Sequence, residues 1–109
     1  MLDVRLYLAQ RITAMIMAPL VLGHLAVMIY AVQGGLTASE ILARTQGSIA
    51  WGAFYGLFVI AVSIHAAIGL RVLVHEYLQV RGAALGLFTA AAALIFLFMG
   101  GRAVIAVVL

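Results

Sequence analysis

Three long apolar stretches alternate with short polar segments along this chain, at about residues 12–32, 49–70 and 83–99 or beyond. Each stretch approaches or reaches the roughly 20 residues that a helix needs to cross a bilayer. The pattern therefore predicts three transmembrane helices that run up, down and up. We place them at approximately residues 11–33, 48–80 and 83–107.

Local signals add detail to this pattern. Pro19 lies inside the first apolar stretch, and a proline inside a helix removes a backbone hydrogen bond, so we expect a kink near the middle of that helix. Thr37 or Ser39 is placed to cap a short surface helix over residues 39–45, with Glu40 in its first turn. Small residues at helical spacing predict close packing of the second long helix: Gly52, Gly56, Ser63 and Ala67.

Composition supports a membrane protein. The chain is 68% hydrophobic and 8% charged, whereas charged residues make up about 25% of a soluble domain. Its net charge of +3 comes from scattered arginines without a basic run, so no nucleic-acid partner is expected. The lack of cysteine excludes a cysteine-ligated iron–sulfur cluster, a covalently attached c-type haem and a disulfide in this chain. We expect an all-α integral membrane protein whose residues 1–109 form one three-helix domain in the lipid bilayer.

The arginines indicate an orientation. Four lie on the side of the N-terminus and the second loop, and two lie on the other side: Arg5, Arg11, Arg71 and Arg81 against Arg44 and Arg102. Positively charged residues are in excess on the cytoplasmic side of membrane proteins. The N-terminus is therefore predicted to be cytoplasmic, by three against two if Arg71 lies within the membrane.

His65 is the first candidate for chemistry, because a histidine in lipid is costly unless it has a partner. Gly69, one turn later, leaves room for a flat group, and Arg71 supplies a cation. This order suits an axial ligand of a bis-histidine haem whose propionates lie near the arginine. A structural histidine bonded to a carbonyl one turn back is the alternative. Glu76 shares the face of His65 and lies about 16 Å nearer the water.

Two further histidines need an explanation. His24, in the first helix, is either a second haem ligand or a histidine that pairs with another helix. His75 lies near the interface, where it is either solvated or in contact with a propionate.

Four side chains converge on one membrane side if the three-helix topology holds: Arg11, Tyr7, Glu76 and Tyr77. Taken alone, Arg11 and Tyr77 are ordinary interfacial anchors. Together, a tyrosine hydroxyl and an arginine can hold the carbonyls of a quinone by hydrogen bonds, and an acid can relay its protons.

Two motifs resemble those of the membrane-anchor subunits of succinate dehydrogenase and fumarate reductase. Gln10-Arg11-Ile12-Thr13-Ala14 resembles the arginine motif that opens their first helix, and His65-Ala66-Ala67-Ile68-Gly69-Leu70-Arg71, followed by Glu76-Tyr77, resembles their second-helix motif. The resemblance implies a cytochrome b subunit of a succinate:quinone oxidoreductase. It also implies a second three-helix anchor subunit that packs with this one into a helix bundle, a flavoprotein subunit and an iron–sulfur subunit.

The family also implies roles for residues. His65 matches the axial haem b ligand and Arg71 a propionate partner, while Arg11 and Tyr77 match quinone-binding residues with Glu76 as the nearby acid. Electrons from succinate pass through the flavin and iron–sulfur clusters of other subunits, so this chain does not touch succinate. The chain departs from the family where Tyr7 replaces a common serine and Glu76 a common aspartate.

The number of haems stays open at this point. His24 resembles a first-helix ligand of the single-chain, di-haem anchors of the same superfamily. One haem or two shared with a partner subunit, or one haem ligated by both His24 and His65, are the alternatives. A cofactor-free structural or accessory membrane subunit of a respiratory complex is the rival function. The expected location is the bacterial inner (cytoplasmic) membrane.

Overall fold

Four helices make up the fold of residues 3–109, the part of the chain that the computed structural model describes. They are α1 (Val4–Gly34), α2 (Ala38–Thr45), α3 (Ile49–Leu78) and α4 (Gly82–Val108). The three long helices are apolar enough to cross a membrane, and residues 3–109 contain no strand. This confirms the predicted all-α fold with three spans, and the bounds of α3 and α4 lie within two residues of the prediction.

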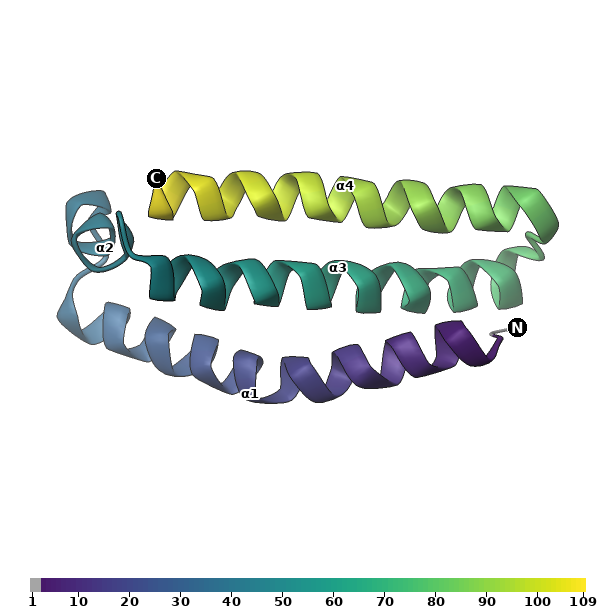
Figure 1. The fold of residues 1–109 in the computed structure, drawn as a ribbon, viewed down its shortest axis with the longest axis horizontal. Coiled ribbons are helices and arrows are strands. Elements are labelled where there is room, and N and C mark those ends of the chain that lie inside the picture. Colours follow the sequence, from purple (N-terminus) through teal and green to yellow (C-terminus); the bar gives the residue numbers. More distant parts are fainter. Residues whose placement is uncertain (1–2) are drawn as a thin grey trace.

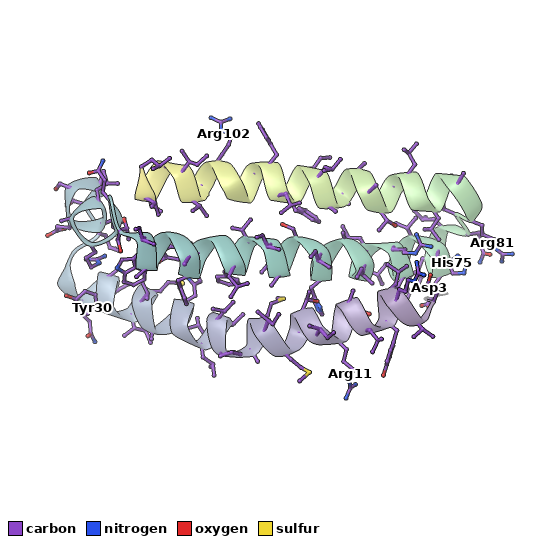
Figure 2. The ribbon with its side chains drawn as sticks, in the orientation of Figure 1. Asp3, Arg11, Tyr30, His75, Arg81 and Arg102 are labelled. Atoms are coloured by element: carbon purple, nitrogen blue, oxygen red, sulfur yellow. The ribbon has the colours of Figure 1, made fainter. Side chains whose placement is uncertain are left out.

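The long helices alternate in direction, and α3 lies between α1 and α4 (Figure 1). The chain's N-terminus and the α3–α4 turn lie at one end of the bundle, which we call the N-terminal end, and α2 covers the other, the α2 end. Arg81 lies at the N-terminal end, whereas Arg102 points outward from the half of α4 nearer to α2 (Figure 2). The arginines therefore divide between the ends as the topology predicted.

The first helix begins earlier than predicted, at Val4 instead of near residue 11. The side chain of Asp3 explains the difference, because its Oδ1 accepts a hydrogen bond from the Leu6 amide at 2.9 Å and caps the helix. The amphipathic residues before Arg11 therefore form the first turns of α1. The helix is bent near its middle, where Pro19 lies (Figure 1), which confirms the predicted kink.

The short helix α2 confirms the predicted surface helix, although it begins one residue earlier, at Ala38. Thr37 and Glu40 form a capping box: Thr37 Oγ1 accepts from the Glu40 amide at 3.3 Å, and Glu40 Oε2 accepts from the Thr37 amide at 3.1 Å. The Thr37 hydroxyl also donates to Glu40 Oε2, and these bonds lower the pKa of the Glu40 carboxyl below 4.5. Thr37, rather than Ser39, is therefore the cap.

Small residues bring α3 close to its neighbours. Ser63 and Ala67 are buried, and a Cβ added at Gly52 would lie 3.3 Å from Val108 Cγ1 of α4. Gly56 has no such neighbour within 4 Å. At the α2 end, Thr45 Oγ1 donates to the Val107 carbonyl at 2.5 Å, which ties the end of α4 to α2. These contacts fix α3, which carries His65.

Large apolar side chains cover the outer surface of the long helices, for example Leu22 (69% exposed) and Leu87 (73% exposed). Helices that are apolar on all sides are typical of membrane spans. At 27 to 31 residues, each long helix is roughly 40–47 Å long, which exceeds the roughly 30 Å hydrocarbon core. Both ends therefore reach the headgroup regions.

Candidate functional site

A hydrogen bond from α3 to α1 holds the imidazole of His65. Its Nδ1 lies 3.1 Å from the carbonyl oxygen of Gln10 and 3.3 Å from the hydroxyl oxygen of Thr13. A carbonyl oxygen only accepts, so Nδ1 carries the proton and donates, and Nε2 keeps its lone pair. The partner is on a neighbouring helix and not one turn back along α3, which was the structural alternative.

The surroundings of Nε2 fit an axial haem ligand. Within residues 3–109, Nε2 has no hydrogen-bond partner, and the residue is partly exposed. A Cβ added at Gly69 would lie 3.9 Å from Gln10 Nε2, an ordinary van der Waals distance, so the Gln10 side chain of α1 lies beside this turn of α3. Metal-ligating histidines commonly donate their other ring N–H to a carbonyl, as His65 does to Gln10.

The described part of the chain does not build a metal centre from its own side chains. It contains no group of three or more His, Cys, Asp or Glu residues that could hold a metal ion. The donor set at His65 is one imidazole. That set suits a cofactor that brings its own equatorial ligands, as haem does.

His24 lies in a different environment. Its ring packs edge-on against Phe58 (5.3 Å between centroids) and Tyr55 (6.1 Å), and its Nδ1 is buried without a partner in the described chain. It borders two cavities of about 310 and 250 Å³ between α1, α2, α3 and α4. The orphaned Nδ1 fits a missing partner, but His24 lacks the orienting bond that His65 has.

The two intramembrane histidines lie at different depths. His65 contacts Thr13, and His24 is 11 residues further along α1, which is about 16 Å at 1.5 Å per residue. The two imidazoles therefore cannot ligate one iron from opposite sides within this chain. Each would need a partner from another subunit.

Arg71 points toward α4, away from the α1-facing side where His65 lies. Its Nη1 donates to Thr89 Oγ1 at 3.2 Å, and Thr89 in turn donates to the Leu85 carbonyl at 2.8 Å. Its Nε is buried without a hydrogen-bond partner among the described residues. A donor thus remains free on Arg71, and its contact with a propionate stays a prediction.

His75 has a local structural partner. Its Nδ1 lies 3.1 Å from the Val80 carbonyl, so it donates there and secures the turn that follows α3. The residue is half-buried at the N-terminal end (Figure 2). The two alternatives, solvation or a propionate contact, therefore concern Nε2, and both stay predictions.

The four predicted quinone-site residues lie at the N-terminal end but do not meet. Tyr7 is 51% exposed and Tyr77 76% exposed, and Arg11 points away from α3 (Figure 2). Glu76 is also exposed. Among residues 3–109, no hydrogen bond joins any of the four to another, so this chain brings them to one end without closing a pocket around them.

Two groups that hold His65 were missed by sequence reasoning, the Gln10 carbonyl and the Thr13 hydroxyl. Thr13 is 6% exposed and belongs to the arginine motif, where attention fell on Arg11. A threonine in an apolar helix was the available signal. A backbone carbonyl leaves no signal in a sequence, because every residue has one.

Comparison with known proteins gives one family. The family model for the succinate dehydrogenase/fumarate reductase transmembrane subunit matches residues 1–101. The match spans α1, α2, α3 and most of α4. Comparisons with curated proteins and with solved structures gave no match. The chain therefore belongs to the family of transmembrane subunits of succinate dehydrogenase and fumarate reductase, as its two motifs had indicated.

Proposed function

We propose that this chain is the membrane-anchor cytochrome b subunit of a succinate:quinone oxidoreductase, with His65 as an axial ligand of haem b. The observation that carries the proposal is the bond from His65 Nδ1–H to the Gln10 carbonyl, which leaves Nε2 free to bind iron. The haem supplies one-electron storage when bound. The chain orients the imidazole from α1, and Gly69 adds no side chain to the next turn of α3.

The N-terminal end contributes to the quinone site in this proposal. Arg11, Tyr7 and Tyr77 offer donors to the quinone carbonyls, and the exposed Glu76 exchanges protons with water. Because these side chains do not enclose a pocket in the described chain, another subunit closes the site. We propose that the iron–sulfur subunit closes the quinone site, since electrons reach quinone from it.

The remaining partners follow from the same proposal. A flavoprotein subunit carries the dicarboxylate chemistry, and a second anchor subunit supplies the other axial ligand and the contacts that the apolar outer surface needs. A propionate contact of Arg71 stays a prediction, because in this chain Arg71 bonds Thr89 of α4 and would have to turn from it to reach a haem at His65. The arginine excess at the N-terminal end supports a cytoplasmic N-terminus, and the proposed location is a bacterial inner membrane.

A second haem at His24 is a further candidate, favoured by the buried Nδ1 without a partner and by the cavities of about 310 and 250 Å³ beside the ring. A hydrogen bond from His24 to another subunit, without a second haem, also accounts for the lack of a partner for Nδ1 within this chain. The size of the b-type signal in His24→Ala separates these two roles.

Absorption spectra of the purified complex test the proposal. We expect the dithionite-reduced minus oxidised spectrum to show a b-type signal that His65→Ala removes. The control Gln46→Ala loses the bond to the Leu109 carbonyl at the α2 end and keeps the signal. A signal halved in His24→Ala supports two haems, and a full signal makes His24 structural. An intact wild-type complex without a b-type signal would refute the haem proposal and favour a cofactor-free subunit.

A further inference from the structure

Thr13 has more hydrogen-bond contacts than a helical threonine needs. Its hydroxyl oxygen lies 2.7 Å from the Ala9 carbonyl, 2.9 Å from the Gln10 carbonyl and 3.3 Å from His65 Nδ1. Both carbonyls only accept, so the single hydroxyl proton goes to one of them. The lone pairs of the oxygen then face the imidazole, whose Nδ1–H is the donor that points at them.

We propose that the Thr13 hydroxyl is a positioning group for His65, because it shares the Nδ1–H of the imidazole with the Gln10 carbonyl and so tunes the ring as an iron ligand. This inference rests on the proposed haem role of His65. Thr13 is 6% exposed, so water does not compete for the contact. The hydroxyl reaches the imidazole across the α1–α3 interface, over 52 positions of sequence.

The chemical consequence is a shift in the redox balance at the iron. Acceptors on the outer N–H of an imidazole raise the basicity of the ring and make its other nitrogen a stronger ligand. A stronger donor stabilises ferric over ferrous iron and lowers the midpoint potential. Removing one of two acceptors raises the potential. The Gln10 carbonyl remains and preserves the tautomer, so the haem is retained.

A purely structural Thr13 predicts a different result. Threonine in a helix often bonds the carbonyl four residues back, as Thr13 does to Ala9, and that bond needs no histidine. Loss of such a bond alters helix stability and leaves the midpoint potential unchanged. The potential therefore separates the two roles, whereas enzyme activity does not.

Redox titration of the b-type absorption in the purified complex tests the inference with Thr13→Val and Thr13→Ser. We expect Thr13→Val to change the ferric-to-ferrous balance several-fold and to raise the potential, a tenfold change corresponding to about 59 mV for a one-electron couple. Thr13→Ser keeps the hydroxyl and the wild-type potential. Thr37→Val, which loses the capping bond from the Glu40 amide at the α2 end, serves as the control and keeps it too.

The outcomes are distinguishable from those of the proposed function. A wild-type complex without haem overturns the haem role and this inference with it. A haem-loaded Thr13→Val with the wild-type potential overturns only the positioning role of Thr13. If Thr13→Val loses its haem, retention in Thr13→Ser supports the hydroxyl, and loss in both variants shows that the side chain's shape matters instead and overturns the inference.

Discussion

The contact between Gly100 of α4 and Val59 of α3 makes a sharp prediction about the helix interface. A Cβ added at Gly100 would lie 2.6 Å from Val59 Cγ1, 3.0 Å from Cγ2 and 3.3 Å from Cβ. Valine is stiff about χ1, so its methyl groups cannot swing away cheaply. Gly100→Ala therefore forces α4 away from α3.

Two opposing effects set the magnitude of this change. Overpacking a close contact costs typically about 1–3 kcal/mol, while replacing glycine by alanine inside a helix gains about 1 kcal/mol from backbone entropy. We expect Gly100→Ala to lower the free energy of unfolding by roughly 0–2 kcal/mol. The neighbouring Gly101 is the matched control, because a Cβ there meets nothing within 4 Å.

Both variants share the helix-propensity gain, so their difference isolates the contact with Val59. We expect the free energy of unfolding of Gly101→Ala to be at least that of the wild type. We expect that of Gly100→Ala to be lower than that of Gly101→Ala by about 1–3 kcal/mol. The assay is unfolding of the purified complex by added dodecyl sulfate, followed by helix circular dichroism. The double variant Gly100→Ala/Val59→Ala should recover much of the stability that Gly100→Ala loses. Equal midpoints for the two alanine variants would refute the close approach.

Two helix caps and Gly69 give three further predictions. Thr37→Ala should weaken α2 by about 0.5–2 kcal/mol and speed its amide exchange. Because the pKa of Glu40 is lowered in the fold, its carboxylate stabilises α2 fully above pH 4.5, and this stabilisation is lost as the pH falls through the lowered pKa. Glu40→Gln should lack this pH transition. Asp3→Ala should fray the first turn of α1 by about 1 kcal/mol, seen as faster exchange of the Leu6 amide, and unchanged exchange would contradict the cap. Gly69→Ala fits the chain, with 3.9 Å to the nearest atom, so we expect normal assembly with a weakened b-type spectrum, and an unaltered spectrum would place the haem elsewhere.

Most of the fold could be predicted from the sequence, because physics leaves a long apolar segment in lipid little choice but helix. The capping signal of Thr37 and Glu40 likewise located α2 to within one residue. The start of α1 was missed because the segment before Arg11 is amphipathic and short, and Arg11 marked the entry of the apolar span. Asp3 was the readable signal for it, and weight was given to hydropathy instead.

The candidate site was predictable only in part. The depth of His65 follows from its place in the second apolar stretch, but its partner depends on the register of α1 against α3, which joins residues 55 positions apart. Arg71 was expected near the same group as His65. Six residues at about 100° each turn it roughly 240° around α3, and it bonds Thr89 of α4 instead. Helix geometry alone could have shown this.

The atoms that lack partners show why the rest of the site could not be read from one chain. His24 Nδ1 and Arg71 Nε are buried without a hydrogen bond in the described residues, and each such atom costs about 1–3 kcal/mol. The two lie on different helices and in opposite halves of the bundle, so one shared neighbour inside the chain cannot satisfy both. Assembly with other subunits can supply partners for the polar atoms that this chain leaves without a hydrogen bond. It can also cover part of the apolar outer surface. Under the proposed function, the groups that complete this site would come from other subunits, which have sequences of their own.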